Sequence, residues 1–144
     1  RVVIQPGLWA LALKIDNHNP ILNIGDDVYI GRFFHIVSVR RVVIEKDVLI
    51  ADKVYISDNL HEYKDIQIPV SQQPVIFKDD VVIKEGAWIG ENVSIIGACI
   101  GRNSVVAANS VVTKDIPDYC VCAGVPAKVI KKYCFERNEW ISVL

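Results

Sequence analysis

The sequence lacks several features that mark common classes of protein. Its formal net charge is −1 at pH 7, so it has no excess of basic residues with which to attract nucleic acid. No apolar run approaches the ~20 residues of a membrane-spanning helix, and no signal-peptide pattern opens the chain. We therefore expect a cytoplasmic protein without a transmembrane segment. The chain also lacks a starting methionine, and we expect that residues are missing from its N-terminus.

Common metal-binding and catalytic motifs are absent as well. The spacing of Cys99, Cys120, Cys122 and Cys134 matches neither a zinc ribbon nor a CxxC redox pair. There is no glycine-rich phosphate loop and no Ser–His–Asp arrangement. We therefore predict reduced cysteines and no bound metal.

What the sequence does have is an apolar position that recurs every six residues. The positions that mark the repeat are Val3, Trp9, Ile15, Ile24, Ile30, Ile36, Ile44, Ile50, Ile56, Ile83, Ile89, Ile95, Ile100, Val106 and Val112. A period of six fits neither a helix nor an alternating strand, but it fits a short strand plus a turn. Three such units make a triangular coil of about eighteen residues, and stacked coils form a parallel β-helix with strands ~4.8 Å apart. We predict an all-β chain in which residues 1–144 form one domain of about five triangular coils.

The six-residue step changes at one place in each coil. After every third marked position the step to the next one is nine, eight, twenty-seven or five residues. All of these deviations fall at one corner of the predicted prism. The largest is the stretch 57–77, which contains His61. Long loops in compact, regular scaffolds are usually functional, so we expect an extruded active-site loop here.

Several motifs resemble those of the hexapeptide-repeat acyltransferases, above all the bacterial sugar O-acetyltransferases of the lipopolysaccharide and capsule type. "VYISDNLHEY" is similar to the family's entry into its active-site loop, and "GAWIGENVSI" is similar to one of its coils. "NSVVTKDIP" followed by "AGVPAKVIKK" is similar to its coenzyme-A-binding end, and "YCFERNEW" resembles the tail of the polysaccharide-modifying branch. The resemblance covers nearly the whole chain and implies a left-handed, single-stranded β-helix. We expect it to end in a short C-terminal helix.

The resemblance implies that His61 is the catalytic base. The ordinary pKa of a histidine imidazole is ~6.5, so the ring is mostly neutral at cytosolic pH and can take a proton from a sugar hydroxyl as the oxygen attacks. Such a base needs a neighbour that fixes its tautomer, and Asp58 is a candidate. Many relatives supply an Asn near the position of Gly31, and this chain departs from that pattern. His35 could participate or be a buried structural residue, and we expect His18 to lie on the surface.

The same resemblance implies a binding site for acetyl-CoA. Trp88 could stack on a sugar or on the pantetheine arm, or could pack between subunits. The backbone N–H of Glu91 matches a donor that faces the thioester carbonyl in relatives. Lysines of the final segment, 113–144, would bind the coenzyme's phosphates. The predicted coenzyme-binding residues are Trp88, Gly90, Glu91, Ala107, Ala108, Thr113, Lys114, Lys128 and Lys131.

These motifs predict an acetyl-CoA-dependent O-acetyltransferase that acts on a sugar of a bacterial surface polysaccharide or its precursor. Flat aliphatic faces and one modified edge lead us to expect a homotrimer with the His61 loop at the subunit contact. N-acetylation of an amino-sugar nucleotide and acetylation of serine are alternatives within the fold. A γ-class carbonic anhydrase would need an H-x4-H pair, whereas the three histidines here are 17 and 26 residues apart. A non-catalytic scaffold is a further alternative, which the histidine loop and the coenzyme-A end disfavour.

Overall fold

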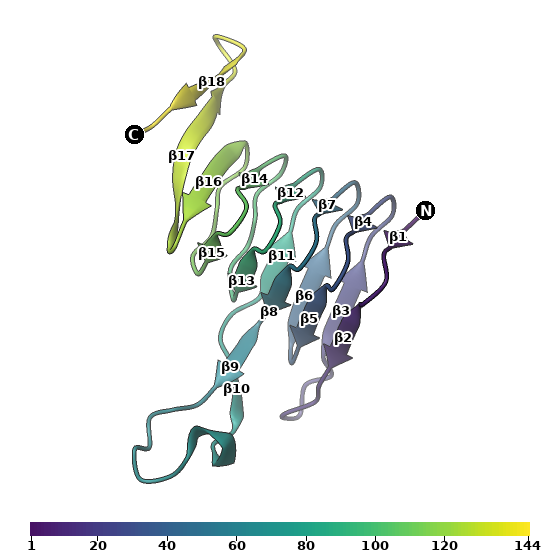
Figure 1. Cartoon of the computed structure of the whole chain (residues 1–144), viewed down its shortest axis with the longest axis vertical. Helices are drawn as coiled ribbons and strands as arrows, with labels where there is room; N and C mark the ends of the chain where they lie inside the picture. The colour runs from purple at the N-terminus through teal and green to yellow at the C-terminus, as the bar shows by residue number, and fades with distance from the viewer.

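The computed structural model describes residues 1–144, which wind into a parallel β-helix of three sheets (Figure 1). Sheet A contains, in spatial order, β1 (Val3–Ile4), β4 (Tyr29–Ile30), β7 (Leu49–Ile50), β12 (Trp88–Ile89), β14 (Val105–Val106), β16 (Cys120–Gly124), β17 (Ala127–Cys134) and β18 (Glu139–Ser142). Sheet B contains β2 (Trp9–Ala12), β5 (His35–Ser38), β8 (Tyr55–Ser57), β13 (Ser94–Ile96) and β15 (Val111–Val112). Sheet C contains β3 (Ile21–Ile24), β6 (Arg41–Ile44) and β11 (Val81–Ile83). The one helical element is the three-residue 3-10 turn η1 (Val70–Gln72), and no helix is long and apolar enough to cross a membrane.

Inward-pointing aliphatic side chains stack from coil to coil and form the core. In sheet A, Ile30 pairs with Ile50 and Ile50 with Ile89, while in sheet B Ile36 pairs with Ile56. All five side chains are fully buried. Burying one such side chain contributes roughly 1.5–3 kcal/mol. The ladders predicted from the six-residue repeat therefore hold these coils together.

The turns between strands repeat one backbone geometry. Asp47, Lys53 and Asn92 have φ angles of 59°, 57° and 57°. From these turns the N–H of Asp47 donates to the carbonyl of Asp26 at 2.9 Å, and that of Asn92 to Asp52 at 3.0 Å. Hydrogen bonding between coils therefore continues through the corners and is not confined to the strands.

The variation in coil length lies at the corner between sheets B and C. The segments that cross this corner are 13–20, 39–40, 58–80, 97–99 and 113–115. The longest of them folds into an antiparallel hairpin of β9 (Asn59–His61) and β10 (Val75–Phe77). This β9–β10 hairpin projects away from the β-helix (Figure 1). The chain thus leaves its regular winding at the residue before β9 and carries His61 outward.

The predicted phase of the repeat is wrong in the first coil. Ile4 and Ala10, rather than the residues before them, pair with the core positions Ile30 and Ile36. Trp9 therefore faces outward and is 56% exposed. Almost every residue from position 2 to 13 is apolar, so spacing alone could not choose between neighbouring positions, and the pairing with the second coil decides it.

The predicted C-terminal helix is also wrong, because the segment forms two antiparallel strands. β17 pairs with β16, and β18 pairs with β17. The β-branched Val129 and Ile130 favour a strand, and hydrogen bonding to β16 covers what would otherwise be an open sheet edge. Tyr133 packs edge-on against Phe135 and Trp140, with ring centroids 5.1 and 5.4 Å away. This aromatic cluster fixes the hairpin beyond the last coil.

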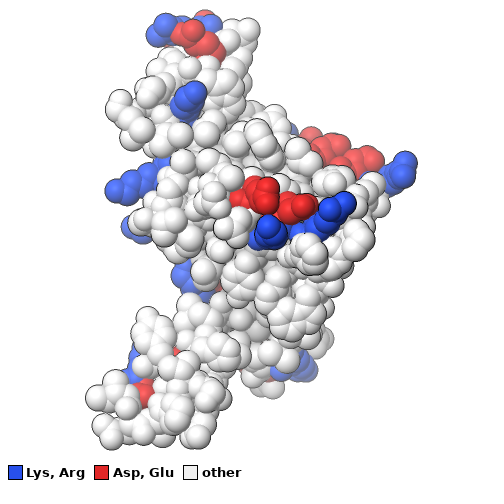
Figure 2. Space-filling view, viewed as in Figure 1, with Lys and Arg blue, Asp and Glu red and all other residues white.

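Charged side chains pair across neighbouring coils. Glu85 lies 3.4 Å from both Lys46 and Arg102, and Lys53 lies 3.7 Å from Glu91. On the face drawn in Figure 2, several positive and negative side chains lie next to one another, while others along the left edge are positive and stand alone.

Candidate functional site

His61 opens onto a groove on the outer face of sheet B. The groove has a volume of about 270 Å³. It is lined by Trp9, Leu11, Leu13, His35, Val37, Tyr55, Asn59, Leu60, His61 and Val75. His61 is exposed at the end of β9, where its backbone pairs with Val75. Its imidazole makes no hydrogen bond within the chain, so both ring nitrogens remain free for a ligand.

His35 lies in the same sheet-B groove, held between two aromatic rings. Its ring centroid is 4.0 Å from that of Trp9 and 4.9 Å from that of Tyr55. Its Nε2 is buried and has no hydrogen-bond partner. Burial lowers the pKa of His35 below the usual value for histidine, so this ring is neutral at neutral pH. His18, by contrast, lies exposed outside the groove and bonds to Asp16 at 3.0 Å.

Asp58, a candidate for orienting His61, does not contact it in the chain. Its carboxylate is fully buried and accepts hydrogen bonds from the N–H groups of Val39, Arg40 and Arg41 at 2.9, 2.8 and 2.8 Å. It makes no hydrogen bond to His61. Three converging N–H groups form a cradle for one carboxylate, and this cradle joins the corner of one coil to the corner of the next. The structure therefore gives Asp58 the role of anchoring the base of the β9–β10 hairpin.

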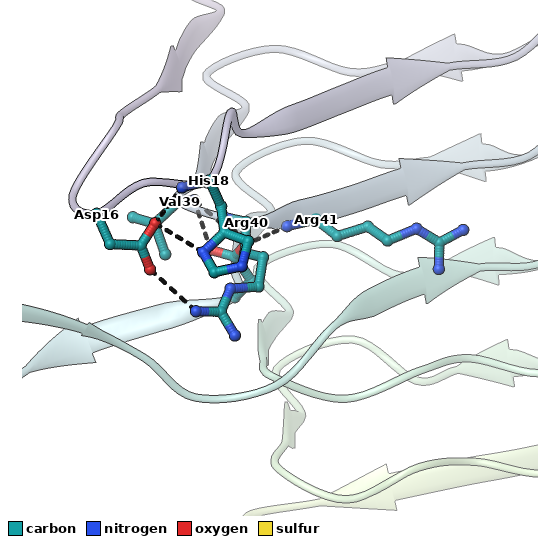
Figure 3. A network of polar contacts seen from close by, with 6 residues as sticks. Asp16, His18, Val39, Arg40 and Arg41 are labelled. Atoms are coloured by element: carbon teal, nitrogen blue, oxygen red, sulfur yellow. Dashed lines mark hydrogen bonds and ion pairs between the residues drawn. The ribbon is translucent and has the colours of Figure 1, made fainter.

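Arg40 ties the hairpin to a second neighbour. Its Nη2 lies 2.9 Å from Asp16 in the 13–20 segment, and its Cζ lies 4.3 Å above the ring centre of Phe77 on β10. Figure 3 shows the guanidinium of Arg40 reaching from the corner of Val39 and Arg41 to the carboxylate of Asp16. Arg40 thus links three successive turns of one edge, the last of which carries His61.

Gly31 lies elsewhere, at the turn between sheets A and B. A side chain there would collide with Asp52 and with the backbone of Ala51. The position does not line the sheet-B groove, so a residue at Gly31 could not orient His61 within one chain. The residues that do line the groove beside His61 include Val37 and Tyr55. Val37 follows the core residue Ile36 and Tyr55 precedes the core residue Ile56. Because side chains alternate along a strand, these positions could have been predicted from the sequence to face outward.

A second groove, on the outer face of sheet A, gathers five of the predicted coenzyme-binding residues. Its volume is about 520 Å³. It is lined by Ala51, Trp88, Gly90, Glu91, Val105, Val106, Ala107 and Ala108. A Cβ at Gly90 would come within 2.6 Å of the backbone N of Ala108, so only glycine lets the two coils approach here. The sheet-A groove is mostly apolar, and its Trp88 is half exposed.

The backbone of Glu91 is free at the rim of the sheet-A groove. Its N–H makes no hydrogen bond within the chain, whereas its carbonyl accepts one from Asn109 at 2.9 Å. Its side chain turns to Lys53, 3.7 Å away. The residue can therefore offer a backbone donor to a ligand, and its carboxylate is already engaged.

The other four predicted coenzyme-binding residues are divided between two places. In sheet A, Lys131 pairs with Val121, and Val121 pairs with the groove residue Val105. Lys131 is therefore in line with the outward-facing residues of the sheet-A groove. Lys128 lies three residues earlier on the same strand and is exposed. Thr113 and Lys114 lie instead at the corner between sheets B and C, the corner of the β9–β10 hairpin. Within one chain, these two residues and the sheet-A groove lie at different parts of the prism.

Known proteins share this architecture and much of this sequence. The family described as bacterial transferase hexapeptide (six repeats) matches residues 80–114. The putative lipopolysaccharide biosynthesis O-acetyl transferase WbbJ of Escherichia coli is 40% identical over 127 residues, which are 83% of this chain and 65% of that protein. The chain belongs to the hexapeptide-repeat transferase family.

Two solved acetyltransferase structures agree with this placement. The polySia-specific acetyltransferase NeuO is 38% identical with a TM-score of 0.66, over 76% of this chain and 47% of that one. A hexapeptide-repeat acetyltransferase from Vibrio cholerae, complexed with acetyl coenzyme A, is 32% identical with a TM-score of 0.68, over 76% and 58%. The chain thus spans between about half and two thirds of the length of these three proteins.

The cysteines of this hexapeptide-repeat chain are poor candidates for a covalent carrier. All four are free thiols, as predicted, and Cys120 and Cys122 are buried in the core. Burial raises the pKa of Cys122 to about 11, and it also raises the pKa of Cys99. The nucleophilic thiolate is therefore scarce at neutral pH. No three His, Cys, Asp or Glu side chains come together in a way that could hold a metal ion.

Proposed function

We propose that this chain carries the active site of an acetyl-CoA-dependent O-acetyltransferase that acts on a sugar hydroxyl of a bacterial surface polysaccharide or its precursor. The observation that carries the proposal is His61, an unpaired imidazole held over a groove by the one long excursion of the β-helix. The similarity to a lipopolysaccharide O-acetyl transferase and to a polySia-specific acetyltransferase supports the choice of a sugar as acceptor.

In the proposed reaction His61 acts as general base. It takes the proton of the acceptor hydroxyl while the hydroxyl oxygen forms a bond to the thioester carbonyl carbon of acetyl-CoA. The tetrahedral intermediate then collapses with cleavage of the C–S bond, and the imidazolium returns the proton to the departing thiolate. Such proton transfer typically accelerates a reaction by ~10²–10⁴-fold. The N–H of Glu91, which has no partner in the chain, would stabilise the oxyanion.

Two copies of the chain are needed to assemble this site. His61, Thr113 and Lys114 belong to the corner between sheets B and C, whereas Glu91 and the sheet-A groove belong to the opposite side of sheet B. A homotrimer would place the first corner of one subunit against the sheet-A groove of the next, and closed symmetry would repeat the contact three times. Sedimentation should then show a trimer at micromolar concentration. A monomer under these conditions would contradict this assembly.

The proposed activity can be tested by measuring CoA release from acetyl-CoA in the presence of purified bacterial glycans and nucleotide sugars. We expect at least one glycan to accelerate release and to gain an alkali-labile O-acetyl ester. His61→Ala serves as the matched control for uncatalysed hydrolysis. An alkali-stable amide on an amino-sugar nucleotide would point to the N-acetyltransferase alternative, and stimulation by free serine alone would point to a serine acetyltransferase.

A further inference from the structure

The sheet-B groove contains two side chains that the proposed chemistry does not use. Trp9 and His35 line it together with His61. They come from neighbouring coils and occupy paired positions of β2 and β5. An inference about them rests on the proposed sugar acetyltransferase, because it concerns how the acceptor is held beside His61.

The burial of His35 determines which of its nitrogens faces a ligand. Nε2 is buried without any partner, while Nδ1 has no partner in the chain and is not enclosed. A buried N–H with nothing to accept it costs more than a buried lone pair, so the proton belongs on Nδ1. Protonation of both nitrogens would leave a buried charge unpaired, so the ring stays neutral. His35 therefore presents a neutral N–H donor and is a poor candidate for a second base.

Trp9 supplies a flat apolar surface next to this donor. One side of its ring system packs against His35 at 4.0 Å between centroids, and the residue remains 56% exposed. Leu11, Leu13 and Val37 form the apolar wall around it. A pyranose has a C–H face that packs well on an aromatic ring and an edge of hydroxyls that seek donors and acceptors. An exposed indole beside one N–H donor and one free imidazole fits both requirements.

We propose that Trp9 and His35 form the acceptor subsite, in which a pyranose ring lies against Trp9 while the Nδ1–H of His35 donates to one of its oxygens. This arrangement leaves a further hydroxyl of the same ring to face His61. The two histidines of the groove thus divide the work: His35 selects and orients the sugar, and His61 removes the proton.

The first test compares variants of His35 that separate the donor from the ring. His35→Phe keeps the aromatic column between Trp9 and Tyr55 but has no N–H. His35→Asn places an amide N–H close to the position of Nδ1. With the glycan that gives the highest turnover, we expect His35→Phe to raise KM for the acceptor about tenfold, with kcat and KM for acetyl-CoA changed less than twofold. His35→Asn should recover most of that loss. A fall in kcat at unchanged acceptor KM, or a similar loss in both variants, would overturn the assignment of His35.

The second test measures sugar binding without turnover. Intrinsic tryptophan fluorescence is titrated with methyl α-galactopyranoside, methyl N-acetyl-β-glucosaminide and N-acetylneuraminic acid. We expect saturable quenching by at least one of these sugars in the wild type and in His61→Ala, because Trp9 is the ring that the sugar covers. Trp140→Phe, which removes an indole on β18, should keep the response, and Trp9→Phe should lose most of it.

The outcomes of the two tests separate the subsite from the proposed function. Quenching that survives in Trp9→Phe, or no quenching by any of the three sugars, would overturn the acceptor subsite. Quenching that depends on Trp9 in a protein that transfers acetyl to no glycan would leave the subsite standing and contradict the acetyltransferase proposal.

Discussion

The carboxylate of Asp58 accepts a hydrogen bond from the backbone N–H of Arg40 at 2.8 Å, while the guanidinium of Arg40 lies 4.3 Å above the ring of Phe77. The side chain of Asp58 thus binds the backbone at Arg40, and the side chain of Arg40 in turn packs on the β9–β10 hairpin that follows Asp58. Asp58 precedes β9 and Phe77 ends β10, so both legs of the β9–β10 hairpin are fixed to the preceding coil. This double attachment explains how an excursion of more than twenty residues can present His61 at a defined place.

Replacing Asp58 tests whether its role is structural. Asp58→Ala removes the acceptor of three N–H groups, of which that of Val39 is buried and those of Arg40 and Arg41 are partly buried. An unsatisfied buried N–H costs roughly 1–3 kcal/mol. We expect the free energy of unfolding in urea to fall by about 3 kcal/mol or more. Asp58→Asn keeps one carbonyl oxygen and should lose less. If Asp58→Ala were as stable as wild type but inactive, Asp58 would be catalytic after all.

Replacing Arg40 tests its hold on the hairpin. Arg40→Met keeps an unbranched apolar stem over Phe77 but loses the charge that faces the ring and Asp16. We expect amide hydrogen exchange in β9 and β10 to accelerate by about twofold to fivefold, because a cation–π contact of this kind is worth roughly 0.5–1 kcal/mol. Exchange in β7 and β12 should not change. Equal acceleration in those core strands would show that Arg40 stabilises the β-helix as a whole.

The lysines of the coenzyme-binding end should act through charge. Lys114 and Lys131 form no ion pair in the chain, so their charges are available to phosphates. We expect the double variant Lys114→Ala, Lys131→Ala to bind acetyl-CoA roughly tenfold more weakly, with a smaller dependence on salt and an unchanged circular dichroism spectrum. Lys46→Ala, which removes a lysine already paired with Glu85, is the control. Unchanged affinity in isothermal titration would remove these lysines from the coenzyme site.

His35 should make the protein less stable in mild acid. Burial lowers the pKa of His35 in the folded state below the ordinary histidine pKa of ~6.5. At pH values between these two pKa values, the unfolded chain therefore binds more protons than the folded one. Stability therefore rises with pH through this window, and the contribution of His35 is lost as the pH falls through it. We expect the melting temperature of the wild type to drop more between pH 7.5 and 5.5 than that of His35→Phe. Equal drops in the two proteins would show that His35 is not desolvated.

The sequence predicted the parts of the fold that repetition specifies. From Ile30 onward the six-residue spacing identified buried positions correctly, and the changes of step located the corner from which the hairpin leaves. The predictions were wrong in the two regions where the repeat is ambiguous or has ended. Around Trp9 nearly every residue is apolar, so the phase depends on pairing with β5. Near Val129 the chain has left the coils, and its conformation depends on the open edge of β16.

The members of the candidate site were predictable only in part: the motifs named His61 and five residues of the sheet-A groove, but not Trp9 or Tyr55 in the sheet-B groove. The groove on sheet A unites Trp88, Gly90, Glu91 and two alanines, as the motifs indicated. The motif that places Asp58 three residues before His61 suggested a catalytic pair. In the folded chain the side chain of Asp58 points instead into the backbone of the preceding coil, a contact between residues 17 to 19 positions apart that no local motif records.

The most direct test of the account is the turnover of His61→Ala at saturating acetyl-CoA and acceptor. If His61 is the general base, the variant should bind acetyl-CoA as the wild type does but lose kcat by ~10²–10⁴-fold. The wild-type rate should rise with pH as an imidazole becomes neutral, and the variant should lose that rise. Near wild-type turnover with the same pH profile would contradict the claim that the β9–β10 hairpin exists to deliver His61 to the reaction.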